Sequence, residues 1–293
     1  ALFVSCSNDD DSSAAPVNPN AGYFNFTAHG ITVPIDTTQT AAINRGGIRL
    51  IGDVFEISII SGFDNNASID RTHMWSIKFD KQGKLISATW SGGIGTKYRN
   101  YKNYPAHFFN VNIISLDETK QKIKLEFFGT LYRNWLDMSS EKGEISGELD
   151  MQYFYSEPST YEISVGAIEQ YCRMKIDGAS WKAYFEHENG VFYSNDPYKI
   201  QIHFTDTASV GAYNFNPAST DNYIKIWKFN PDTMQHEEYL ATGTLAYSYR
   251  EFHGANRYSF IGTYNFSAVN VNDASDVITV TDGTFRSYQQ FWR

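Results

Sequence analysis

The chain is poor in cysteine and proline and contains no long apolar run. Of its 293 residues, 2 are cysteine and 8 are proline. No stretch approaches the roughly 18 apolar residues of a membrane-spanning helix. The formal net charge is −9 and no basic stripe stands out. We therefore expect no nucleic-acid partner.

The sequence also lacks the motifs that define a chemistry. It contains no Gly-x-Ser-x-Gly elbow, no phosphate-binding glycine-rich loop and no dinucleotide fingerprint. The 7 histidines do not stand at a familiar metal-ligand spacing. The chain has 33 acidic residues, so a pair of carboxylates can always be proposed between distant strands. Such pairs are therefore no evidence for a glycosidase site. We therefore predict no catalytic residues, no metal site and no cofactor.

The first residues resemble the cleavage site of a bacterial lipoprotein precursor. The apolar run 2–4 is followed by the small Ser5 and by Cys6, which is the pattern of a lipobox. The resemblance implies that residues 1–5 are the end of a signal peptide and that Cys6 becomes a lipidated, palmitate-bearing N-terminus. Such an anchor holds a protein to a membrane without spanning it. The alternative is a cysteine that follows three apolar residues by chance.

Polar and acidic residues follow the cysteine directly: Ser7, Asn8, Asp9, Asp10 and Asp11. This run is similar to the surface-export signal of lipoproteins in the Bacteroidota. The similarity implies an outer-membrane protein that faces the cell exterior. The alternative is a solvated acidic linker. In both interpretations the segment has nothing to bury, so we expect a disordered tether.

Aromatic residues are abundant, with 20 tyrosines and 21 phenylalanines. Apolar and polar residues alternate between clusters of glycine, asparagine and aspartate, as in 54–59, 75–79 and 84–90. This alternation favours strands over helices. The glycine-containing segments 80–83 and 177–178 are typical hairpin turns. We predict an all-β protein with two consecutive antiparallel β-sandwich modules after the lipidated tether.

Length and composition divide the chain into four parts. At roughly 100 to 200 residues per domain, the chain is long enough for two domains. A polar, proline-containing segment at 156–160 separates two blocks of alternating residues. The assigned parts are residues 1–5 as residual signal peptide, 6–21 as tether, 22–158 as the first module and 159–293 as the second module.

A short pattern recurs near the end of each module. Gly129-Thr130-Leu131 is followed by Gly147, and Gly243-Thr244-Leu245 is followed by Gly262. Each pair predicts an antiparallel hairpin and suggests a duplication. The motif is short, so coincidence is the alternative.

Several motifs of the second module resemble an uncharacterised β-sandwich module that is common in Bacteroidota lipoproteins. The motifs are 175–181, 210–213, 243–245, 262–266 and 281–285. The first module resembles that family mainly in its Gly-Thr-Leu and Ile-Ser-Gly-Glu-Leu motifs, at 129–131 and 145–149. The chain thus resembles a surface lipoprotein with a tandem pair of such modules, the second being the better match. That family has no established catalytic residues, so the resemblance implies fold and location and leaves activity open.

A dense run of tyrosines suggests a ligand. Tyr98, Tyr101 and Tyr104 are interleaved with Arg99 and Lys102. Tyrosine rings stack on the C–H faces of sugars while polar neighbours bond their hydroxyls, so this loop is a candidate glycan site. The alternative is that the tyrosines cover a sheet edge or the junction between the modules.

Together these observations predict a non-enzymatic, lipid-anchored binding or accessory protein of the cell surface, with a glycan as its ligand. One alternative is a structural or adhesive protein that contacts another envelope protein through an exposed sheet edge. A further alternative is a hydrolase with a site between the modules.

Overall fold

The computed structural model describes residues 22–28, 31–36, 47–61, 73–92, 96–156, 163–165, 168–187, 190–205, 207–255 and 257–290. The predicted signal remnant, the tether, the lipidation site Cys6 and the export signal Ser7 to Asp11 lie outside these residues. Within the described ranges, no helix has the length and apolar character needed to cross a membrane.

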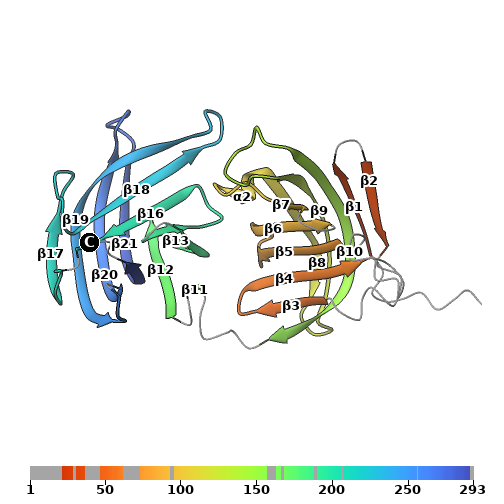
Figure 1. Ribbon diagram of the computed structural model, residues 1–293, viewed down its shortest axis with the longest axis horizontal. Helices are drawn as coiled ribbons and strands as arrows, with labels where there is room; N and C mark the ends of the chain where they lie inside the picture. The colour runs from red at the N-terminus through yellow and green to blue at the C-terminus, as the bar shows by residue number, and fades with distance from the viewer. Residues whose placement is uncertain are drawn as a thin grey trace, which may run out of the picture.

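All strands of the first sheet come from residues 22–156 (Figure 1). Its order is β2-β1-β10-β3-β4-β5-β6-β7-β9-β8, with an additional β10–β9 pairing. One short helix, α2, follows β7. The elements are β1 (Gly22–Ala28), β2 (Ile31–Asp36), β3 (Gly47–Ile51), β4 (Val54–Ser61), β5 (His73–Asp80), β6 (Leu85–Gly92), β7 (Thr96–Arg99), α2 (Pro105–Phe108), β8 (Phe109–Asp117), β9 (Lys122–Tyr132) and β10 (Lys142–Ser156).

Strand β10 closes this sheet on itself. It pairs with β9 along one edge, and with β1 and then β3 along the other edge. The series β10-β3-β4-β5-β6-β7-β9 therefore returns to β10. The sheet surrounds a core that includes Phe55, Trp75 and Leu125, all buried.

The second sheet contains the strands of residues 163–290. Its order is β11-β12-β21-β20-β19-β18-β16-β15-β14, with β13 paired to β12 and β17 paired to β19. Its core includes Ile202, Leu245 and Phe285. The elements are β11 (Ile163–Val165), β12 (Ile168–Ile176), β13 (Ala179–Lys182), β14 (Phe185–His187), β15 (Val191–Tyr193), β16 (Tyr198–His203), β17 (Gly211–Phe215), β18 (Tyr223–Asn230), β19 (Gln235–Phe252), β20 (Arg257–Asn270) and β21 (Val277–Gln290).

The all-β class that the alternating sequence predicts is confirmed. The hairpin at Asp177-Gly178 is also confirmed, because both residues have positive φ and join β12 to β13 with Ile176 opposite Ala179. The two glycine motifs lie in the antiparallel hairpins β9–β10 and β19–β20. The division of each module into two packed sheets, as in a sandwich, stays a prediction.

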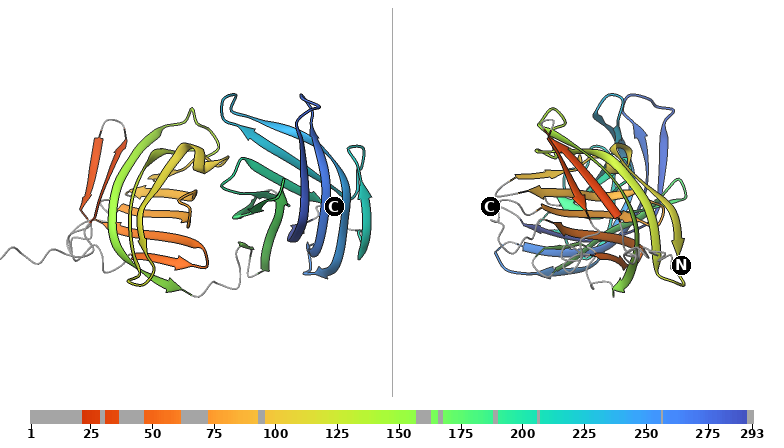
Figure 2. Two further views of the ribbon diagram at one scale, coloured as in Figure 1. Left: turned by 180° about the vertical axis from the view of Figure 1, so that it is seen from behind. Right: turned by 90° about the vertical axis from the view of Figure 1, so that its right-hand side faces the viewer.

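The two modules lie side by side along the long axis of the molecule (Figure 2). Their junction contains a small hydrophobic cluster separate from both cores: Tyr101 and Tyr132 of the first module pack with Phe229 at the end of β18. The ring centroids of Tyr101 and Phe229 are 5.8 Å apart. Two hollows are also lined by residues of both modules.

Candidate binding site between the modules

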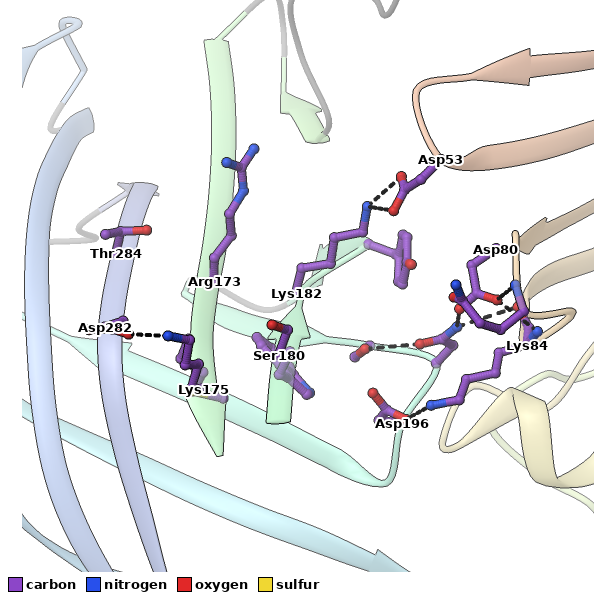
Figure 3. A pocket seen from close by; sticks show the side chains of 16 residues that line it. Asp53, Asp80, Lys84, Arg173, Lys175, Ser180, Lys182, Asp196, Asp282 and Thr284 are labelled. Carbon is purple, nitrogen blue, oxygen red and sulfur yellow. Dashed lines mark hydrogen bonds and ion pairs between the residues drawn. The ribbon is translucent and has the colours of Figure 1, made fainter. Parts of the chain in front are cut away.

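The larger hollow, here the central cleft, has a volume of about 480 Å³ and is lined by both modules (Figure 3). The first module contributes the β3–β4 turn and the β5–β6 turn. The second contributes the β12–β13 hairpin, the β15–β16 loop and β21. The lining residues are Asp53, Asp80, Gln82, Lys84, Arg173, Met174, Lys175, Ser180, Trp181, Lys182, Tyr184, Ser194, Asn195, Asp196, Asp282 and Thr284.

Two ion pairs cross the central cleft from one module to the other. Lys182 Nζ lies 2.7 Å from Asp53 Oδ1, and Lys84 Nζ lies 3.0 Å from Asp196 Oδ1. The hydrogen bond to Asp196 raises the pKa of Lys84, so this lysine is charged in the physiological range. Partly exposed pairs contribute only about 0 to 1 kcal/mol each. Their main consequence is to fix the position of the β3–β4 turn against β13 and of the β5–β6 turn against the β15–β16 loop.

A third contact between the modules is a hydrogen bond from a neutral amide to a carboxylate. Asn195 Nδ2 donates to Asp80 Oδ2 at 3.2 Å. The other carboxylate oxygen of Asp80 accepts the backbone N–H groups of Gln82 and Lys84, at 3.0 and 2.9 Å. Asp80 therefore stabilises the β5–β6 turn and docks the second module at the same time.

The carboxylates of the cleft are all engaged. Besides the three aspartates above, Asp282 lies 2.7 Å from Lys175 Nζ within the second module. A carboxylate that contacts an ammonium group or N–H donors is held in one position by charge-assisted hydrogen bonds. Each carboxylate oxygen can accept more than one hydrogen bond, so these groups keep acceptor capacity. Among the described residues, no group of three or more histidine, cysteine or acidic side chains could hold a metal ion.

A second hollow, here the basic groove, lies on the outward face of the first module and has a volume of about 420 Å³. Tyr184 lines both the central cleft and the basic groove, so the two hollows adjoin at this ring. The lining residues of the groove are Lys78, Ile86, Ser87, Thr89, Lys97, Arg99, Asn100, Lys102, Trp135 and Tyr184.

The tyrosine platform predicted from the sequence is not formed. Tyr98 is 2% exposed and belongs to the core of the first module, where its ring lies 5.4 Å from that of Trp90. Tyr101 is 7% exposed in the junction cluster, and Tyr104 packs against the same cluster. The buried rings of Tyr98 and Tyr101 cannot offer a face to a sugar, whereas the ring of Tyr104 is half-buried. Tyr101 and Tyr104 lie at the junction between the modules, where the alternative interpretation puts them.

Of the charged residues that line the two hollows, the sequence pointed to Arg99 and Lys102 of the basic groove, beside the tyrosines, whereas those of the central cleft were not predicted. The segment 80–83 was recognised as a turn, and so was Asp177-Gly178 beside Lys175. Both turns lie at sheet ends that border the central cleft. Which sheet ends face each other depends on the docking of the modules, and strand patterns contain no information on that docking.

Comparison with known proteins does not extend this description. No family model, no curated protein and no solved structure matches the chain. A function must therefore be argued from the geometry of the two hollows.

Proposed function

We propose that this chain is a non-enzymatic binding protein that captures a saccharide at the junction of its two modules, held at the outer face of the bacterial outer membrane by a lipid on Cys6. The observation that supports binding most directly is the central cleft. Its volume of about 480 Å³ lies within the range of roughly 300 to 1,000 Å³ that is usual for ligand sites, and such sites are common between domains.

The lining of the cleft suits a polyhydroxylated ligand. Sugar hydroxyls both donate and accept hydrogen bonds, and the cleft presents carboxylates, ammonium groups, the hydroxyls of Ser180 and Thr284 and the amide of Gln82. The half-buried ring of Tyr184 supplies an aromatic edge, with Lys182 Nζ 5.1 Å from its centroid. The aspartates of the cleft are held in place by their contacts with lysines, Asn195 and backbone N–H groups, which suits a fixed set of acceptors for a ligand.

Binding is tested with the whole chain carrying Cys6→Ser, which removes the acylation site, on a glycan array. We expect a saccharide signal that Tyr184→Ala weakens. The matched control is Tyr249→Ala, because Tyr249 is exposed on β19 and lines neither hollow. A blank array from folded protein would contradict the proposal and would favour the adhesive alternative.

Location is tested in the bacterium. The proposal predicts that an alkyne-labelled palmitate is incorporated into the native chain and not into Cys6→Ser. It also predicts that added protease cleaves the protein on intact cells. Replacing Asp9, Asp10 and Asp11 by alanine should leave acylation unchanged and protect the protein from protease. Labelling that persists in Cys6→Ser would disprove the lipid assignment.

A further inference from the structure

The basic groove is built on the outward face of three neighbouring strands. In the β6–β7 register Thr89 is opposite Arg99, and in the β5–β6 register Ser87 is opposite Lys78. Lys97 precedes Arg99 by two residues on β7, so it points to the same face, roughly 6 to 7 Å along the strand. The strand pairing therefore places hydroxyls and cations side by side on one surface.

The positive charge of the groove is not fully compensated by the chain. Lys78 is neutralised, because its Nζ lies 3.4 Å from Glu56 Oε1. Lys97 and Arg99 form no ion pair with any carboxylate in the described ranges, and the groove lining contains no acidic residue. The pKa of Lys97 is below its ordinary value because burial disfavours the ammonium ion and because Arg99 repels it. A bound anion would relieve this repulsion.

The guanidinium of Arg99 contacts an aromatic ring and keeps its N–H donors available for such an anion. Its Cζ lies 5.4 Å from the centroid of the Trp135 ring. A cation–π contact of this kind uses none of the guanidinium N–H donors, so they stay available for bidentate binding of a carboxylate or a sulfate. The ring therefore limits the movement of Arg99 without using its donors.

We propose that the basic groove binds an acidic saccharide, with Arg99 and Lys97 on its carboxylate or sulfate group and with Ser87 and Thr89 on its hydroxyls. This inference names a ligand class and rests on the proposed binding function. The neighbouring hydroxyls and the aromatic rings of Trp135 and Tyr184 favour a sugar over a bare inorganic anion.

The whole-molecule charge argues for a saccharide over the other large anions. With a formal net charge of −9, the protein repels a nucleic acid or an anionic bilayer over distances comparable to the Debye length. A short acidic oligosaccharide contacts only the groove and avoids most of this repulsion. The local charge of Lys97 and Arg99 then dominates its binding.

The test is calorimetric titration of the Cys6→Ser chain with tetragalacturonate, with a sulfated galactan tetrasaccharide and with neutral maltotetraose. We expect at least one acidic ligand to bind more tightly than the neutral one, and its affinity to fall when NaCl is raised from about 50 to about 500 mM. The carboxylated and sulfated ligands show which group is preferred.

The variant Lys97→Gln/Arg99→Gln should weaken acidic-ligand binding at least about tenfold, which corresponds to about 1.4 kcal/mol. The charge-matched control is Lys120→Gln/Lys142→Gln, whose side chains are exposed on the first module outside both hollows. Near-ultraviolet circular dichroism checks folding, and the single variant Lys97→Gln replaces the double variant if that one unfolds.

The outcomes separate the two proposals. Loss of acidic-ligand affinity in the groove variant but not in the control supports the inference. Acidic binding that is unchanged in the groove variant, or equally reduced in the control, overturns it. Neutral saccharide binding that Tyr184→Ala abolishes, without acidic binding, overturns this inference and leaves the proposed function intact. No saccharide binding at all overturns both.

Discussion

At the scale of single residues, Gln170 is a polar side chain in apolar surroundings. It is 0% exposed on β12, and among the described residues neither its amide nitrogen nor its amide oxygen has a hydrogen-bond partner. An unsatisfied buried polar group costs about 1 to 3 kcal/mol. Gln170→Met keeps the length of the side chain and removes both groups, so we expect the free energy of unfolding to rise by about 1 kcal/mol in urea denaturation.

Gln289 provides the matched control for this substitution. It is 3% exposed on β21, but its Nε2 donates to Ile202 O at 2.8 Å and to Ser287 Oγ at 3.3 Å. Gln289→Met should therefore lower the free energy of unfolding, because it leaves the Ile202 carbonyl without this donor. The same sign of change in both variants would argue against our account of Gln170.

At the scale of elements, the close approach of β19 and β20 depends on Gly243. A Cβ atom at this position would lie 2.2 Å from Asn265 O and 2.6 Å from Phe266 Cα. These contacts are with backbone, so the strands must separate to accept alanine. We expect Gly243→Ala to reduce the free energy of unfolding by about 1 to 3 kcal/mol in chemical denaturation.

Gly47→Ala is the comparison for this effect. Gly47 begins β3, and a Cβ atom added there would meet nothing within 4 Å. Its free energy of unfolding should stay within about 0.5 kcal/mol of the native value. An equal loss in the two variants would mean that the cost comes from glycine removal in general and not from strand contact at Gly243.

Strands β19 and β20 also show how much of the fold can be predicted from the sequence. Alternation in the sequence puts Phe260, Tyr264 and Phe266 on one face of a strand, because a strand repeats every two residues, and in β20 all three are buried. The glycine motifs correctly predicted two hairpins. Their registers differ, since Gly129 is opposite Ile145 whereas Gly243 is opposite Phe266. The hairpins therefore do not align their glycines, which weakens the case for duplication.

The candidate site was harder to predict for a physical reason. Tyr101 becomes buried because Phe229 of the other module packs against it. Lys84 meets Asp196 across the central cleft for the same reason. Strand periodicity describes each sheet by itself. Contacts formed by docking two sheets join residues far apart in the chain, and no local pattern identifies them.

At the scale of the whole molecule, His236 makes the junction sensitive to acid. Its ring centroid lies 5.3 Å from that of Phe229 in the junction cluster. The pKa of His236 falls from 6.5 to about 4 because burial disfavours the imidazolium ion, and the charges of Lys199 and Lys102 add to this effect. Between these values the unfolded chain binds a proton that the folded protein does not.

Stability contributed by neutral His236 is therefore present above pH 6.5 and is lost as the pH falls toward 4. We expect this loss to be about 1 to 2 kcal/mol after allowance for solvent screening at a partly exposed site. The measurement is urea denaturation at several pH values from neutral to acidic. His236→Gln should lose less stability over this interval, and an unchanged pH profile in that variant would exclude His236 as the source.

The pairing of early strands with late strands has a consequence for folding. Gly22 of β1 is opposite Leu149 of β10, and Tyr171 of β12 is opposite Arg286 of β21. Neither module can complete its sheet until almost all of its residues have been synthesised. Non-local pairing of this kind makes folding slow, on the order of milliseconds to seconds. Strand β10 is synthesised before the second module begins. We therefore expect the first module to fold before the second. The folded first module then provides the surface on which the second module docks.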